Sequence, residues 1–106
     1  MARRIIWSKE SLENKYSIFE YWNTVTGNKK YSIKLDELFN ISVELLSIYP
    51  KIGRKSDHKD IRVKVVKKYL IIYEIFDTQI GILTIWDSQQ NPKDLERLIQ
   101  TYNSNN

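Results

Sequence analysis

Cationic side chains crowd into one segment of the chain, and they are the residues best suited to chemistry on an anion. Between positions 51 and 68 the basic residues are Lys51, Arg54, Lys55, Lys59, Arg62, Lys64, Lys67 and Lys68, against Asp57 and Asp60. Cations at this density can neutralise phosphates or meet an acidic protein surface. Composition alone favours a plainer interpretation, a solvated loop followed by the outer face of a strand.

Other catalytic chemistry has little support in the sequence. The chain has no cysteine, which excludes disulfides and thiolate zinc sites. Its one histidine, His58, lies in a polar loop without a second histidine, so we expect a solvated residue and not a general base. We therefore expect neither a metal nor a cofactor.

Length and charge limit the class of protein. The chain has 106 residues, a net charge of +4 and a pI near 9.3, which predicts one domain over residues 1–106 with a modest preference for acidic partners. Lys9 and Glu10 follow the first apolar residues too closely for a signal peptide, and no apolar run approaches the roughly 18 residues of a membrane span. A soluble, cytoplasmic protein without membrane contact is the expectation.

Two helices are predicted in the first half. Ser8 can cap the first helix, which should end near Gly27, and Asn28 can cap a second helix from about Lys29 to the boundary before Pro50. The expected apolar stripe of the first helix is Leu12, Tyr16, Phe19 and Trp22. That of the second is Tyr31, Leu35, Leu38, Ser42, Leu45, Leu46 and Tyr49, and Ile41 and Ile48 add a second face, so we expect both faces to be covered.

Strand patterns surround this helical pair. A short strand is expected at 3–7, and three more at 61–66, 69–76 and 80–86 form a meander with tight turns. Alternation in the first strand of the meander places Arg62 and Lys64 on one face. The next two runs are almost continuously apolar, which indicates central strands or strands covered on both faces, with helices on one side.

A last helix should begin at Asn91 and Pro92, with a frayed end after Tyr102. The predicted fold is therefore α+β in the order β-α-α-β-β-β-α, a helical hairpin packed on an antiparallel sheet. Trp7, Trp22 and Trp86 have apolar neighbours at helical or strand spacing, so we expect packing residues and not base-stacking platforms.

Several residues match one family in order and spacing. They are Pro50, Ile52, Gly53 and Arg54, then Arg62 and Val63, then Tyr69 and Tyr73, and finally Trp86-Asp87-Ser88 and Gln90-Asn91-Pro92. Over its whole length the chain resembles the RelE/ParE superfamily of bacterial toxins. That resemblance implies a growth-inhibiting toxin of a type II toxin–antitoxin module, of the kind associated with plasmid stabilisation, held in a hetero-oligomer by a small antitoxin that often regulates their operon.

The resemblance also supplies candidate site residues. Members that cleave messenger RNA on the ribosome use clustered cations and no metal to offset the charge that develops on the phosphodiester. Arg54, Arg62 and Lys64 match that cluster. Where the nuclease branch carries further arginines, this chain has Leu70 and Gln89. The remaining motif positions of the family are Gly53, Tyr73, Asp87, Gln89 and Asn91.

These matches support three hypotheses. The first is a ParE-like toxin that inhibits DNA gyrase by protein–protein contact, because the arginines of the nuclease branch are missing. The second is an RNA endonuclease with the reduced cluster Arg54, Arg62 and Lys64, for which the ribosome supplies orientation. The third is a toxin weakened at Gln89, where close relatives resemble Asp-Ser-Arg-Gln-Asn-Pro, and retained for antitoxin binding and operon regulation. Tyr102 could serve the nuclease branch as a late aromatic residue, but we expect it to pack under the sheet.

Overall fold

The computed structural model describes residues 2–89 and 92–104. In chain order the elements are β1 (Arg4–Trp7), α1 (Lys9–Thr26), α2 (Lys30–Ile48), the 3₁₀ turn η1 (Pro50–Ile52), β2 (Arg54–Lys55), β3 (Ile61–Val66), β4 (Tyr69–Ile75), β5 (Gln79–Asp87) and α3 (Pro92–Ser104). The predicted α+β order and the helical hairpin are confirmed. The addition is β2, whose two charged residues carry no apolar alternation that could reveal a strand.

The described strands form one mixed sheet in the order β1-β5-β4-β3-β2. Neighbours from β2 to β5 pair antiparallel, as the meander predicted, whereas β1 pairs parallel to β5 with Arg4 opposite Gln79. The prediction of a purely antiparallel sheet was therefore wrong for β1. The intervening helices and meander supply the long connection that a parallel pair needs, and a four-residue apolar run does not encode its own direction.

Local capping chemistry sets the limits of the hairpin. The Ser8 hydroxyl accepts a hydrogen bond from the Ser11 N–H at 3.0 Å, and Gly27 closes α1 in the left-handed conformation with φ 75°. Asn28 does not occupy the N-cap position itself, which belongs to Lys29, but its side-chain oxygen accepts from the Lys30 N–H at 3.0 Å. Both predicted boundaries hold within a residue.

The helical hairpin packs on one face of the sheet. Its buried contacts come from α2, through Leu35, Phe39, Val43 and Leu46, and they meet inward side chains of β4 and β5. On α1 the predicted stripe holds only in part: Phe19 and Trp22 pack against this core, whereas Tyr16 is 67% exposed. The expectation that α2 would be covered on both faces is also wrong, because Ile41 and Ile48 lie exposed.

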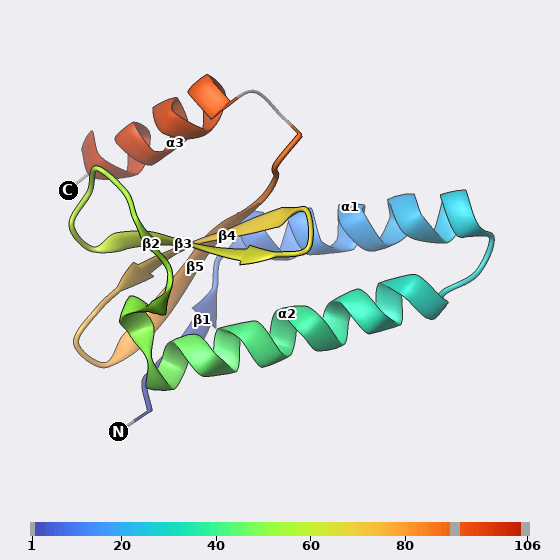
Figure 1. Ribbon diagram of the computed structural model, residues 1–106, viewed down its shortest axis with the longest axis horizontal. Helices are drawn as coiled ribbons and strands as arrows, with labels where there is room; N and C mark the ends of the chain where they lie inside the picture. Colours follow the sequence, from blue (N-terminus) through green and yellow to red (C-terminus); the bar gives the residue numbers. More distant parts are fainter. Residues whose placement is uncertain (1, 90–91, 105–106) are drawn as a thin grey trace.

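The opposite face of the sheet is covered by α3, so helices lie on both sides (Figure 1). Ile99 of α3 is buried with Ile61, Val63, Leu70 and Ile72, and Leu95 and Trp86 pack against them at the edge. The expected placement of the helices on one side is corrected by this contact. It also explains the apolar run of β4, a central strand whose first five residues are all buried.

The first turns of α1 cover the part of β5 that extends beyond β1. The Ser8 N–H donates to the carbonyl of Ile82 at 3.0 Å, and the Ser8 hydroxyl donates to that of Leu83 at 2.7 Å. The Asn14 side-chain oxygen accepts from the Ile85 N–H at 3.0 Å. These bonds satisfy an edge that would otherwise be open. Among the described helices, none is long and apolar enough to cross a membrane.

Candidate functional site

The three candidate cations do not meet on one surface. Residues directly opposite in paired strands point to the same face, and Arg54 lies opposite Val63, whose side chain is buried on the α3 side. Arg62 and Lys64 alternate with Val63 and therefore point to the hairpin side. The predicted shared face of Arg62 and Lys64 fits this register. Arg54 lies across the sheet from them, beside a cavity of about 260 Å³ that Glu96 and Ile99 also line.

Arg62 is engaged in holding the turn after α2. One guanidinium nitrogen, Nη1, donates to the carbonyl of Gly53 at 2.9 Å and to that of Lys51 at 3.2 Å. The Nε atom is buried and meets no partner among the described atoms. Carbonyl oxygens of the turn thus occupy Nη1, which carries two of the five N–H donors of the guanidinium.

Tyr73 binds the same turn from the core side of the sheet. Its hydroxyl donates to the carbonyl of Pro50 at 2.6 Å and accepts from the Gly53 N–H at 3.0 Å, while its ring is fully buried. Burial raises the pKa of this hydroxyl above its ordinary value of 10.0, although the bond from Gly53 and the charge of Arg62 act in the other direction. The phenol remains neutral and able to donate at physiological pH.

Gly53 is required here for space. Its backbone is extended, with φ −72°, so the conformation would suit any residue. A Cβ at this position would lie 2.4 Å from the Tyr73 hydroxyl oxygen and 2.9 Å from the Val63 carbonyl oxygen. Gly53, Arg62 and Tyr73, three of the motif positions, therefore form one structural unit, which we call the turn network.

A larger cavity, of about 600 Å³, lies between α1, the ends of β4 and β5, and α3. Asp87 and Gln89 line it from the end of β5, with Lys68 and Tyr69 from the β3–β4 turn and Tyr21 from α1. The Gln89 side chain is exposed, and the Gln89 backbone N–H donates to Asp87 Oδ1 at 2.9 Å. The motif position Asn91, together with Gln90, lies outside the described residues, as does the side chain of Tyr102.

Lys68 is the central cation of this cavity. Its Nζ lies 3.4 Å from Asp87 Oδ2 and 5.5 to 5.9 Å from the ring centroids of Tyr21, Trp22 and Tyr69. Trp22 Nε1 donates to the Tyr69 hydroxyl at 2.8 Å, and burial raises the pKa of that hydroxyl. Sequence reasoning counted Lys68 among the cations and missed this role, although its neighbours Tyr69 and Asp87 are motif residues.

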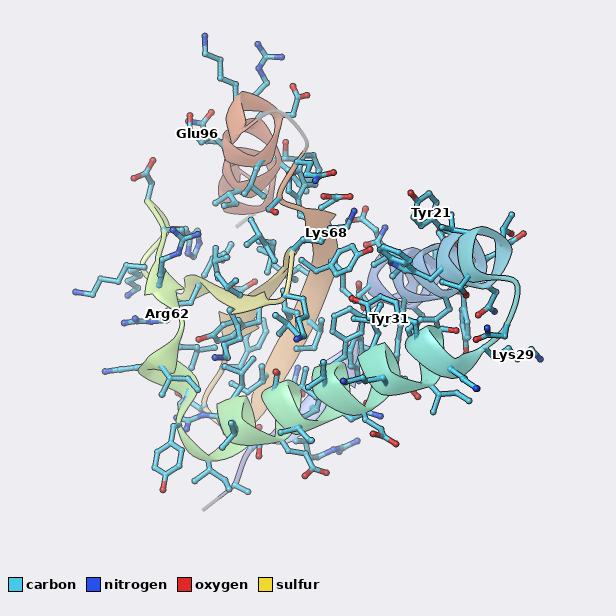
Figure 2. All side chains as sticks on the ribbon, turned by 45° about the vertical axis from the view of Figure 1, so that its right-hand side comes forward. Tyr21, Lys29, Tyr31, Arg62, Lys68 and Glu96 are labelled. Atoms are coloured by element: carbon cyan, nitrogen blue, oxygen red, sulfur yellow. The ribbon has the colours of Figure 1, made fainter. Side chains whose placement is uncertain are left out.

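The turn network and the Lys68 cavity are separate. Arg62 pairs with Tyr73, whereas Tyr69 pairs with Asp87, four positions away along β4. At about 3.3 Å per residue, Tyr73 beside Arg62 and Tyr69 beside Lys68 lie roughly 13 Å apart along β4. Figure 2 likewise shows Arg62 at one margin of the sheet and Lys68 toward α1. The cations therefore do not converge on Gln89.

The remaining candidates fall into ordinary roles. His58 lies in the loop, as predicted, and its Nδ1 accepts from the Asp60 N–H at 3.2 Å. Leu70 is buried against the α3 side and supplies no polar group. Trp7 and Trp22 pack against the core under the hairpin and Trp86 against that under α3, which confirms them as packing residues. Within residues 2–89 and 92–104 no group of three or more His, Cys, Asp or Glu side chains could hold a metal ion.

Comparison with known proteins identifies relatives of this fold. Residues 5–92 match the family model described as ParE toxin of type II toxin-antitoxin system, parDE. A solved structure of the chromosomal ParDE TA system from P. aeruginosa superposes with a TM-score of 0.71 at 15% identity, covering 83% of this chain and 98% of that one. The comparison with curated proteins gave no match.

Proposed function

Because the chain belongs to the ParE toxin family, and is thus the toxin component of a type II toxin–antitoxin system with an antitoxin as its partner, we propose that it acts by binding and inhibiting DNA gyrase. The observation that carries this proposal is the division of the candidate cations between two faces of the sheet. Electrostatic catalysis of phosphodiester cleavage requires cations that converge on one developing charge.

Two further features support inhibition by contact. One guanidinium nitrogen of Arg62, Nη1, is bonded to two backbone carbonyls, and Leu70 and Gln89 stand where the nuclease branch carries arginines. A protein–protein mechanism needs a defined surface and no aligned general base. The fold offers such surfaces on the exposed side of the hairpin and around the Lys68 cavity.

The test is a supercoiling assay with purified gyrase and toxin that has been freed of its antitoxin. We expect inhibition that depends on toxin concentration and that added antitoxin reverses. Unchanged supercoiling at a large excess of folded toxin would refute the proposal. Toxin that has been denatured and left unfolded serves as the negative control.

Ribosome-dependent cleavage of messenger RNA is the second candidate, and one observation favours it: Arg62 and Lys64 share a face. Its test uses ribosomes programmed with a defined message. Lys64→Ala is the informative variant, because the Lys64 side chain forms no hydrogen bond or ion pair with the described residues, whereas Arg62→Ala would also release the turn. Cleavage that Lys64→Ala abolishes would favour this candidate over gyrase inhibition.

A further inference from the structure

A row of apolar side chains on the outer side of α2 lies uncovered. Ile41, Leu45 and Ile48 follow one another at spacings of four and three residues, which places them on one stripe of the helix. Their exposed fractions are 58%, 41% and 56%. Tyr49 and Ile52, 58% and 49% exposed, continue the row along the chain into η1. These five residues are called the α2 patch below.

The end of the α2 patch is fixed in place by the turn network. Tyr73 and Arg62 together bind the carbonyls of Pro50, Lys51 and Gly53 and the Gly53 N–H, so four backbone groups of the turn are held. The buried Tyr73 and the half-buried Arg62 thus order an exposed segment, although that segment contributes no side chain to either core. A surface held in one conformation loses little entropy on binding, which favours a docking role.

Uncompensated positive charge borders the patch at the turn. Lys51 lies within η1, and Lys55 lies opposite Arg62 on the same sheet face. The ion pairs of the described residues include Lys15–Asp36, Lys68–Asp87 and Arg97–Asp94, and none of these involves Lys51, Lys55 or Arg62. Two copies that met with their turns together would bring these like charges together, which disfavours that arrangement.

One long side of the apolar stripe on α2 is acidic. Glu37 and Glu44 stand on the outer side of α2 beside Ile41 and Ile48. A complementary partner therefore carries its carboxylates at the end facing η1 and not along its whole length. A helix with one apolar face fits a helical stripe of this kind, because ridges of side chains at spacings of three and four interlock.

We propose that the α2 patch docks an amphipathic helix of the cognate antitoxin, with apolar residues on Ile41, Leu45 and Ile48 and with carboxylates facing Lys51 and Lys55. The inference rests on the toxin assignment under the proposed function and does not depend on gyrase being the target. The α2 patch shares no residue with the lining of the Lys68 cavity.

The first test compares two aspartate substitutions at equally exposed apolar positions. Ile48→Asp alters the patch, and Val25→Asp, 58% exposed near the end of α1, is the matched control. The probe is the antitoxin encoded in the same operon, titrated calorimetrically into each purified toxin. We expect Ile48→Asp to weaken binding by about 30- to 100-fold or more and Val25→Asp by less than about threefold. Equal affinities of the two variants would overturn the proposal.

The second test concerns charge. Lys51→Glu should slow antitoxin association several-fold and flatten its dependence on salt, because it removes attraction at the turn. Lys29→Glu is the control, since Figure 2 shows Lys29 at the far tip of the hairpin from Arg62. Equal association rates for both variants would refute the prediction that the docked helix places its carboxylates at the η1 end of the patch.

Parallel assays of the same variants distinguish the antitoxin from other molecules that could occupy the α2 patch. Loss of antitoxin affinity in Ile48→Asp supports the proposal whether or not gyrase inhibition is also lost. If Ile48→Asp retains antitoxin affinity, the proposal fails, and the other assays show what the patch binds instead. Loss of gyrase inhibition would assign the patch to the target, and loss of binding to phosphatidylcholine–phosphatidylglycerol vesicles would assign it to lipid. Loss of a dimer in sedimentation would assign it to a second copy of the chain. A wild-type toxin that binds antitoxin through the patch but leaves gyrase unaffected would refute the proposed target alone.

Discussion

Removing the hydroxyl of Tyr73 tests the turn network directly, because Tyr73→Phe deletes one oxygen and leaves a ring of the same shape in the core. The ring is fully buried. Its oxygen serves two backbone groups, the Gly53 N–H at 3.0 Å and the Pro50 carbonyl at 2.6 Å. The substitution therefore leaves a donor and an acceptor without their partner and creates no cavity beyond the missing oxygen.

The expected cost follows from those two groups. Leaving a buried polar group without a partner costs about 1–3 kcal/mol, and a net hydrogen bond contributes about 1 kcal/mol. The turn is exposed on its outer side, so water can reach part of the released backbone, and we place the total at about 2–3 kcal/mol. For a domain of this size that corresponds to a fall in Tm of about 10–15 °C.

Urea unfolding followed by circular dichroism measures the change in the free energy of unfolding. Tyr16→Phe is the control, because Tyr16 is 67% exposed and its hydroxyl bonds to no group in the described residues; less than about 0.5 kcal/mol is expected. A loss in Tyr73→Phe no larger than that in Tyr16→Phe would refute the claim that this hydroxyl holds the turn.

Three further changes have defined outcomes. Because burial raises the pKa values of Tyr69 and Tyr73, the unfolded chain loses these protons first as pH rises, so thermal scans should show stability intact below about pH 10 and falling above it, less steeply in Tyr73→Phe; an equal slope would contradict this. Ser8→Ala removes the cap of α1 and the bond to the Leu83 carbonyl, and should cost about 1–2 kcal/mol in urea unfolding; an unchanged midpoint would contradict both roles. Gln89→Arg adds a cation to an exposed position and should raise toxicity on induction without changing Tm; unchanged colony survival would remove the hypothesis of a toxin weakened at Gln89.

Local chemistry made most elements of the fold predictable. Ser8, Gly27 and Pro50 mark boundaries that the structure reproduces, since capping and the lack of a proline N–H act within a few residues. The direction of β1 and the existence of β2 escaped prediction because both depend on pairing with strands more distant in sequence. Side-chain spacing on α2 also could not decide which stripe would face the sheet, since apolar residues occur on both sides of the helix.

The candidate site was less predictable than the fold, because it depends on register. The types of Arg54, Arg62 and Lys64 were correctly recognised as cations within a short segment. Whether they share a face is set by the pairing of Arg54 with Val63, and a shift of one residue would have reversed the result. The bond from Tyr73 to Pro50 spans 23 residues and leaves no local signal.

The turn network changes what a motif match can mean in this chain. Arg62 fits the position of a catalytic cation, yet its contacts are those of a residue that orders Lys51 and Gly53. Its presence is therefore equally expected in a toxin that never touches RNA. Lys64 lies on the same face without such a task, so its side chain can be removed without releasing the turn. The choice between a nuclease and a gyrase inhibitor thus depends more on Lys64 than on Arg62.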